Sequence, residues 1–212
     1  MKFFGYFRSS SAYRCRIAFN IKGIEPEESF VHLRKGEQRS PEYLRRNPLG
    51  LVPTLELDRR TLAQSLAIVE WLEEMFPEPP LLPRNPLDRA YVRALSLTVA
   101  CEIHPLQNLR VLDHLKTEFG QDQEGLNAWC QKWIRTGLEA YEGMLAQSGL
   151  AGAFSFGDEA TLADICLIPQ VFSAQRFKVD ISDLEAIQKI AANAERHPAF
   201  SAAHPAKQPD AE

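Results

Sequence analysis

The feature that most constrains this fold is a proline-rich segment near the middle of the chain. Five of the 14 prolines fall among the ten residues from Pro77 to Pro86. Proline has no backbone N–H to donate and disfavours helix in the residue before it, so this stretch suits neither a helix nor a central strand. It predicts an extended linker, assigned to residues 81–86, between a domain over residues 1–80 and a domain over residues 87–212.

Residues 1–80 alternate between strand and helix signals. Apolar or alternating runs that are typical of strands occupy 3–7, 29–33, 54–57 and 61–63, and the last two pair across a turn at Asp58-Arg59-Arg60. Helices are predicted to follow the serine cap Ser9-Ser10-Ser11, to begin at Pro41, and to follow a cap at Ser65, because serine caps and first-turn prolines favour initiation. The resulting order is β-α-β-α-β-β-α.

Residues 87–212 carry helical periodicity and no clear strand signal. The helical patterns span 87–118, 124–147 and 183–197, and Thr161-Leu162-Ala163-Asp164 is a capping box ahead of a further apolar run. We expect the tail from His204 to fray. The predicted fold class is therefore α/β plus all-α, with a helical bundle after the linker.

Composition argues against several classes of function. A net charge of −4 is atypical of a dedicated nucleic-acid binder. No apolar run reaches the roughly 18 residues of a membrane span, and the first residues lack a signal-peptide pattern, so we expect a cytoplasmic protein without a membrane partner. The cysteines are far apart and form no CxxC pair, which favours reduced thiols and no metal site. They are Cys15, Cys101, Cys130 and Cys166.

Five sequence blocks stand out by their order along the chain. They are Ser9-Ser10-Ser11-Ala12-Tyr13-Arg14-Cys15-Arg16-Ile17-Ala18, Asn47-Pro48-Leu49-Gly50-Leu51-Val52-Pro53-Thr54-Leu55, Gln64-Ser65-Leu66-Ala67-Ile68, Gly157-Asp158-Glu159-Ala160-Thr161-Leu162-Ala163-Asp164, and the stretch from Pro169 to Asp180. Over about residues 2–209 they resemble the zeta class of glutathione transferases. Ser11 departs from the family signature by replacing a cysteine, and Tyr13 by replacing a tryptophan.

The resemblance implies a thioredoxin-like domain followed by an all-helical domain, a homodimer, and glutathione as cofactor. It implies a cis–trans isomerase that converts maleylacetoacetate to fumarylacetoacetate in the homogentisate route of tyrosine and phenylalanine breakdown. Maleylpyruvate, isomerised by close bacterial relatives in the gentisate pathway, is the nearest alternative substrate. In either reaction a thiolate adds to one carbon of a cis double bond, the resulting single bond rotates, and elimination gives the trans product.

The serine turn is the expected catalytic element. Ser9 is predicted to donate to the glutathione sulfur with Ser10 assisting, because hydroxyl donors at a helix N-terminus lower the pKa of a thiol. Arg8 precedes this turn and is counted with the two serines as catalytic. The alternative is that these serines only cap the helix.

Further residues are assigned to glutathione by the same resemblance. Val52 and Pro53 are expected to meet its cysteinyl backbone, and the helix start at Gln64 and Ser65 to meet its γ-glutamyl carboxylate. The remaining candidates for cofactor contact are Gln38, Gln107 and Asn108. For each the alternative is an ordinary turn, cap or solvated side chain, and His104 is as readily a structural histidine as a cofactor contact.

A dicarboxylate substrate requires local positive charge in a net acidic protein. Arginine can grip a carboxylate with two parallel hydrogen bonds. Arg8, Arg110 and Arg176 are the candidates, and a solvated surface role is the alternative for each. Trp129 and Trp133 lie four residues apart and are interpreted as core, with a ligand-stacking pair as the alternative.

Other functions on the same fold remain to be weighed. A general glutathione transferase or dehalogenase needs the activated thiolate but no carboxylate clamp, so Arg8 and Arg176 favour the isomerase. A non-catalytic association module would be expected to lose the serine turn or the Val52-Pro53 turn. A thiol–disulfide oxidoreductase needs a cysteine at the first helix start, and residues 9–12 contain none.

Overall fold

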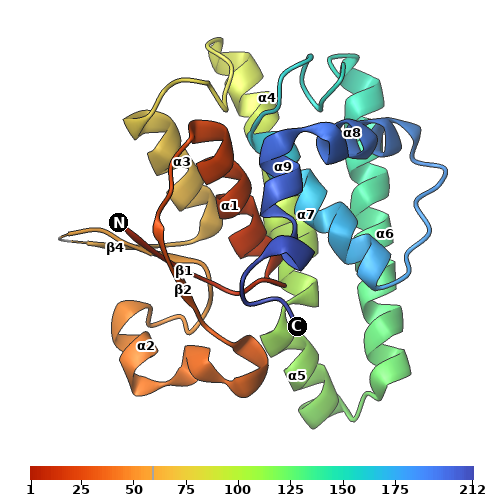
Figure 1. The fold of residues 1–212 in the computed structure, drawn as a ribbon. Coiled ribbons are helices and arrows are strands. Elements are labelled where there is room, and N and C mark those ends of the chain that lie inside the picture. Colours follow the sequence, from red (N-terminus) through yellow and green to blue (C-terminus); the bar gives the residue numbers. More distant parts are fainter. Residues whose placement is uncertain (59) are drawn as a thin grey trace. The chain divides into compact units, whose positions relative to one another are not determined.

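The protein is described by a computed structural model that covers residues 1–58 and 60–212 (Figure 1). Arg59, in the predicted hairpin turn, lies outside the described residues. The chain divides into two compact units, one made of residues 1–81 and 195–212 and the other of residues 82–194. This differs from the expected helical domain of 87–212, because the last residues pack with the first unit.

The first unit has the predicted β-α-β-α-β-β-α order and then receives a helix from the C-terminal segment. Its elements are β1 (Lys2–Gly5), α1 (Ser10–Lys22), β2 (Glu27–Phe30), α2 (Pro41–Arg46), β3 (Thr54–Glu56), β4 (Thr61–Ala63), α3 (Ser65–Met75) and α9 (Pro198–Ala203). The sheet order is β2-β1-β3-β4, with β2 parallel to β1 and the pairs β1–β3 and β3–β4 antiparallel. The thioredoxin-like fold class is confirmed, although the second strand begins at Glu27 rather than at Ser29.

Both faces of the central strand are buried because its side chains alternate. Phe3 points toward α1, where its ring lies 5.2 Å from the ring of Phe19 in an edge-on contact. Phe4 points to the opposite face and meets Tyr43 of α2 at 6.1 Å. Figure 1 shows α1 and α3 together on one side of the sheet and α2 on the other. The sheet is therefore an inner layer, and its ends are free to carry turns.

The C-terminal segment is bound to α1 instead of fraying. The Asn20 side chain donates to the Ala199 carbonyl at 2.9 Å, and Arg16 Nε donates to the Ala203 carbonyl at 3.1 Å. Phe200 is buried, and its carbonyl accepts from the Tyr13 hydroxyl at 3.4 Å. Beyond His204, Asp210 Oδ2 accepts from the Phe7 amide at 2.8 Å, 203 residues away in sequence, so the expectation of a frayed tail from His204 is wrong.

The second unit is helical, as predicted. Its helices are α4 (Pro86–Leu97), α5 (Leu109–Phe119), α6 (Gln123–Ser148), α7 (Leu162–Arg176) and α8 (Glu185–Arg196), of which α8 ends in the first unit. The predicted capping box is present: Thr161 caps α7, and the buried Asp164 accepts from the Thr161 amide at 2.8 Å. No helix among the described residues is long and apolar enough to cross a membrane.

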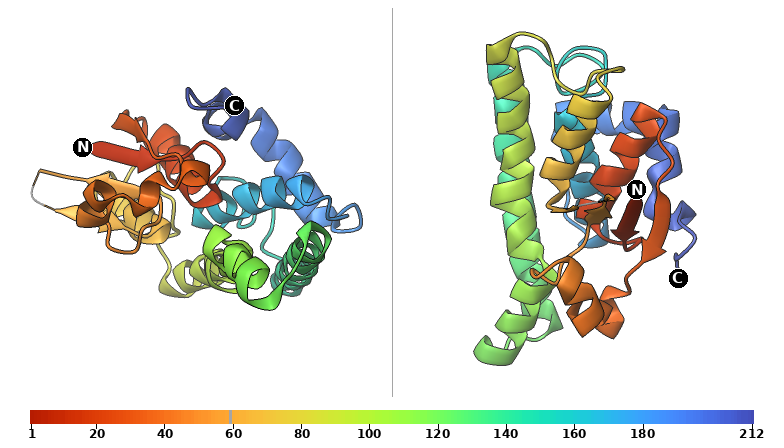
Figure 2. Two further views of the ribbon diagram at one scale, coloured as in Figure 1. Left: turned by 90° about the horizontal axis from the view of Figure 1, so that it is seen from below. Right: turned by 90° about the vertical axis from the view of Figure 1, so that its left-hand side faces the viewer.

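The predicted single helix over 87–118 is interrupted. After α4 the backbone widens into a π-helical segment, Thr98–Ile103, followed by a 3₁₀ turn, His104–Gln107, before α5 begins. The run keeps one general direction through the interruption (Figure 2), so the apolar periodicity hides it. Single π-helical turns inside helices occur frequently at functional sites, and this one leads directly to Gln107 and Asn108.

The π-helical segment is packed against a glycine of α6. A Cβ built on Gly137 would lie 2.2 Å from Cγ1 of Ile103, which is fully buried. Gly143 in the same helix is exposed, and a Cβ there would meet nothing within 4 Å. Comparing Gly137 with Gly143 distinguishes the two effects of a helical glycine: it permits close packing, and it lowers helix propensity.

Gly137→Ala is expected to lower the free energy of unfolding by about 1–3 kcal/mol, because the fully buried Ile103 would have to shift within the core. Gly143→Ala is expected to raise it by about 0.5–1 kcal/mol, since alanine is the better helix former. Denaturant unfolding of both variants tests this. Stabilisation by both substitutions would show that Ile103 does not need the glycine.

Candidate functional site

The sheet register brings the predicted glutathione turns to one end of the sheet. Phe4 of β1 pairs with Thr54 of β3, and Thr54 pairs with Ala63 of β4. The serine turn follows β1, the Val52-Pro53 turn precedes the antiparallel β3, and Gln64-Ser65 follows β4, so all three leave the same end. Gln38 also lies beyond this end, because it follows β2, which runs parallel to β1. The first unit thus assembles its predicted site residues by topology alone.

Ser9 is the N-cap of α1, the helix that begins at Ser10. Its backbone is extended, and its hydroxyl oxygen accepts from the Ala12 amide at 3.2 Å. That bond uses an oxygen lone pair and leaves the hydroxyl hydrogen to be donated. Ser9 is partly exposed, whereas Ser10 is buried. The geometry therefore suits Ser9 as a donor to a ligand better than it suits Ser10.

The Val52-Pro53 turn is braced by a buried polar network. The peptide bond between Val52 and Pro53 is cis. Asn47, which is 2% exposed, donates from Nδ2 to the Leu51 carbonyl at 2.7 Å, and the Tyr43 hydroxyl donates to the same oxygen at 2.7 Å. Asn47 of the predicted motif thus stabilises the turn through the Leu51 carbonyl.

The third turn differs in one detail from the prediction. Gln64 occupies the N-cap position of α3 with a φ of 74°, and Ser65 is the first helical residue, so Ser65 is not the cap. The Ser65 hydroxyl instead accepts from Nη1 of Arg14 at 3.3 Å. Arg14 is 2% exposed, and its Nε and Nη2 have no hydrogen-bond partner within the described chain. The buried Arg14 guanidinium is therefore in contact with the first residue of α3.

Arg8 and Gln38 complete the predicted residues of the first unit. The Arg8 guanidinium lies over the Phe7 ring, 5.1 Å from its centroid, and the side chain is partly exposed. Gln38 is 6% exposed, and its Oε1 lacks a partner among the described residues. An orphaned amide oxygen at this end of the sheet is an acceptor for a ligand N–H.

The remaining predicted residues lie in the second unit, around the 3₁₀ turn. Gln107 is buried and donates from Nε2 to Gln170 Oε1 of α7 at 2.6 Å. Asn108 is the N-cap of α5, and its Oδ1 accepts from the Arg110 amide at 3.2 Å. Arg110 is exposed in the first turn of α5, and not within the continuous helix that was predicted.

Arg176 is the last residue of α7 and is exposed. Its guanidinium lies 4.6 Å from the centroid of the Phe177 ring. Burial raises the pKa of Cys130 in α6 to about 11, and the positive charge of Arg176 opposes that rise. Arg176 therefore belongs to the part of the second unit where α7 ends beside α6.

Comparison with known proteins places the chain in a family. Residues 8–75 match the model described as "Glutathione S-transferase, N-terminal domain". The maleylacetoacetate isomerase of Pseudomonas aeruginosa is 44% identical over 213 residues, which cover 99% of this chain and 98% of that protein. The chain belongs to the zeta-class glutathione transferase family.

Two solved structures match the whole chain. One is the holo structure of a maleylpyruvate isomerase, described as a bacterial zeta-class glutathione S-transferase, with a TM-score of 0.98, 45% identity and full coverage of both chains. The other is the maleylacetoacetate isomerase of Methylobacterium extorquens AM1 with bound malonate and glutathione, with a TM-score of 0.97, 38% identity and full coverage of both chains. The similarity includes both units and supports an isomerase enzyme.

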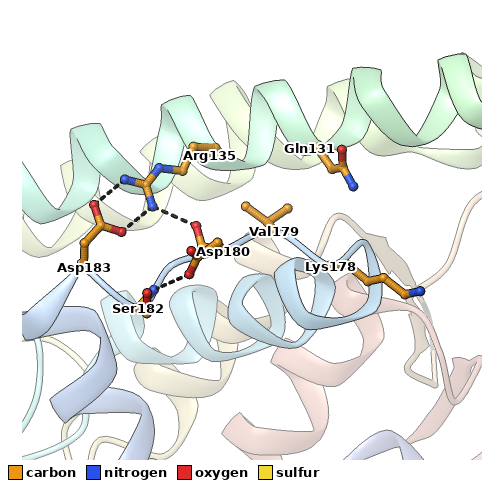
Figure 3. A pocket seen from close by; sticks show the side chains of 7 residues that line it. All are labelled: Gln131, Arg135, Lys178, Val179, Asp180, Ser182 and Asp183. Atoms are coloured by element: carbon orange, nitrogen blue, oxygen red, sulfur yellow. Dashed lines mark hydrogen bonds and ion pairs between the residues drawn. The ribbon is translucent and has the colours of Figure 1, made fainter.

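One surface pocket of this zeta-class chain contains none of the predicted site residues. It has a volume of about 510 Å³ and is lined by parts of α6 and of the loop after α7. Figure 3 shows its arginine, Arg135, turned toward Asp183, with which it makes bonds of 2.5 and 2.6 Å. This guanidinium is already paired, and Asp180 and Asp183 offset the charges of Arg135 and Lys178 in the lining, so the pocket is a poor site for a dicarboxylate.

Sequence reasoning missed two buried arginines of α1. Arg14 and Arg16 are both under 10% exposed, and neither is among the predicted site residues. Arg16 lies three residues after Tyr13, a spacing that puts both on one face of a helix, so its place on the buried face of α1 was a usable signal. The tryptophans Trp129 and Trp133 pack edge-on at 5.6 Å, and Trp129 Nε1 donates to the Leu106 carbonyl at 2.7 Å.

Proposed function

We propose that this zeta-class enzyme is a glutathione-dependent cis–trans isomerase that converts maleylacetoacetate to fumarylacetoacetate. The observation that carries the proposal is the meeting of the serine, Val52-Pro53 and Gln64-Ser65 turns at one end of the sheet. The family relationship and the glutathione bound in the Methylobacterium extorquens relative support the cofactor. A homodimer and a cytoplasmic location stay predictions.

Maleylpyruvate is a second candidate substrate. It is favoured by the 45% identity and the TM-score of 0.98 to a maleylpyruvate isomerase. Both substrates are small cis dicarboxylates, so the residues discussed below serve either one. The comparison of initial rates on the two substrates distinguishes them.

The polar groups at this end of the sheet fit glutathione. Two helix N-termini open here, those of α1 and α3, and each favours a negative charge. Glutathione supplies a thiolate when bound, which adds to the double bond and leaves again after rotation. Ser9 would hold the sulfur by donating its hydroxyl hydrogen, and so would stabilise the thiolate against a free-thiol pKa of about 8.5.

The γ-glutamyl carboxylate is assigned to the N-terminus of α3. The first amides of a helix have no intrahelical partner and can donate to an anion. The Ser65 hydroxyl accepts from Arg14, which leaves its own hydrogen for the carboxylate. The buried charge of Arg14 adds to the helix dipole behind Ser65. Gln38 is the candidate for the glycyl end, and Val52 for the cysteinyl backbone.

The substrate carboxylates are assigned to arginines. Arg8 lies beside the serine turn, Arg110 opens α5, and Arg176 closes α7. The malonate in the Methylobacterium extorquens relative supports a dicarboxylate as the ligand class. A general transferase would use the thiolate without these arginines, and this difference provides the test.

Arg176→Ala is expected to raise the KM for the dicarboxylate about 10–150-fold, the cost of losing one charge-assisted hydrogen bond of about 1.5–3 kcal/mol. Conjugation of glutathione to an uncharged electrophile should be nearly unchanged, since that substrate has no carboxylate. Both activities are measured on one preparation, with glutathione affinity by calorimetry.

Arg135→Ala is the matched control because Arg135 is paired with Asp183 and lies in the same unit. It should leave the dicarboxylate KM unchanged. An equal loss of both activities in Arg176→Ala would make Arg176 structural and contradict the carboxylate clamp.

A further inference from the structure

The Tyr6–Ser9 turn, which positions Ser9, contains backbone N–H and C=O groups that find no hydrogen-bond partner within the turn. The turn closes when the Ser9 amide donates to the Tyr6 carbonyl at 2.9 Å. Tyr6 and Phe7 are 4% and 5% exposed, so their remaining backbone groups need partners inside the protein. Two side chains from outside the turn, those of Asp210 and Arg16, supply them.

The first partner is Asp210, which lies 203 residues further along the chain. Its Oδ2 accepts from the Phe7 amide at 2.8 Å. The second is Arg16, which donates from Nη2 to the Phe7 carbonyl at 3.0 Å and from Nη1 to the Tyr6 carbonyl at 3.5 Å. Between them, the two side chains hold the turn from its N–H side and from its carbonyl side.

Asp210 and Arg16 also interact electrostatically. Burial lowers the pKa of Arg16 to about 10, and the negative charge of Asp210 is the largest influence opposing this shift. Asp210 Oδ1 is buried and has no hydrogen-bond partner in the described part of the chain. A carboxylate in such a place is costly, and it is compensated here by a backbone N–H and a nearby cation.

Attachment of the C-terminal segment does not depend on Asp210. Phe200 is buried, and the carbonyls of Ala199 and Ala203 accept from α1. Beyond Asp210, the Glu212 side chain pairs with His32. The segment would stay in place without the Asp210 carboxylate. The carboxylate therefore acts on the Tyr6–Ser9 turn and not on attachment of the segment.

We propose that Asp210 is a positioning residue: with Arg16 it fixes the Tyr6–Ser9 turn, and so sets the direction in which Ser9 and Arg8 face their ligands. The inference rests on the proposed function, because it gives Ser9 its role toward the glutathione sulfur. The C-terminal segment thereby contributes to a site whose catalytic turn lies near the N-terminus.

The test uses Asp210→Ala, which removes the acceptor, and Asp210→Asn, which keeps an oxygen for the Phe7 amide. Glu212→Ala is the matched control, because it removes one negative charge from the same segment. For each variant the ultraviolet absorbance of the thiolate is followed against pH with glutathione bound, together with kcat and the glutathione Kd. Circular dichroism checks folding.

Asp210→Ala is expected to lower kcat by roughly 10–100-fold, the scale of a misplaced catalytic group, while the glutathione Kd stays within about threefold. The pH midpoint of thiolate formation should rise by about one unit, because the donor no longer faces the sulfur. Asp210→Asn should restore most of both quantities, and Glu212→Ala should leave both unchanged.

Several results would overturn the inference. An unchanged midpoint in Asp210→Ala would do so, and so would equal losses in Asp210→Ala and Glu212→Ala. If Asp210→Ala does not fold, Arg16→Lys decides, since a lysine cannot hold both carbonyls and must raise the midpoint likewise. Ser9→Ala is measured in parallel: if it shifts the midpoint and Asp210→Ala does not, the proposed function stands and this inference falls. If Ser9→Ala does not shift it either, both fall.

Discussion

Ser9→Ala is expected to lower the turnover number by about 10–1000-fold, the range found when one preorganised donor to a developing or stored negative charge is removed. The Ser9 hydroxyl oxygen is occupied by the Ala12 amide, and its hydrogen remains for the sulfur. Without that hydrogen, less of the bound glutathione is ionised near neutral pH. Steady-state kinetics at saturating glutathione measure the effect.

The control for this substitution is another capping serine of the same unit. Ser40 caps α2, and its oxygen accepts from the Tyr43 amide at 3.2 Å, the same distance as between Ser9 and Ala12. Each cap contributes about 1 kcal/mol to stability, so both variants should be destabilised similarly. Ser40→Ala should retain turnover within about twofold. If both variants lose turnover equally, Ser9 acts through helix stability and not through the thiolate.

The end of the sheet could be predicted from sequence because its determinants are local. A strand followed by a capping serine, an Asn-Pro turn and a strand ahead of Gln64-Ser65 each leave a short-range pattern. Their convergence follows from the strand directions, which the β-α-β-α-β-β-α order largely determines. The misassigned cap at Ser65 is also local: Gln64 takes a positive φ that a serine-based rule does not anticipate.

The features that escaped prediction depend on distant residues. Asp210 looks like part of a polar tail until the fold brings it to Phe7. Arg16 looks solvated because charged side chains are rarely buried, but it donates to the carbonyls of Tyr6, Phe7 and Ala203, and Ala203 is 187 residues away in sequence. The break at Thr98–Ile103 leaves the apolar periodicity intact, so only its packing against Gly137 reveals it.

The second large expected effect is the loss of isomerase activity when glutathione is removed. Of the described cysteines, Cys15, Cys130 and Cys166 are buried, and Cys101 in the π-helical segment is exposed. Burial also raises the pKa of Cys130 to about 11, which keeps it protonated at neutral pH. In the proposed mechanism the nucleophile is the thiol of glutathione, so activity should depend on its presence.

The most direct measurement of the central claim is the rate of cis–trans isomerisation by dialysed enzyme with glutathione, without it, and with S-methylglutathione. The S-methyl compound presents the same carboxylates and amides to the sheet end but has no thiolate to add. The account predicts full activity with glutathione, only the uncatalysed background without it, and inhibition by S-methylglutathione in competition with glutathione. Equal rates with and without glutathione would contradict it.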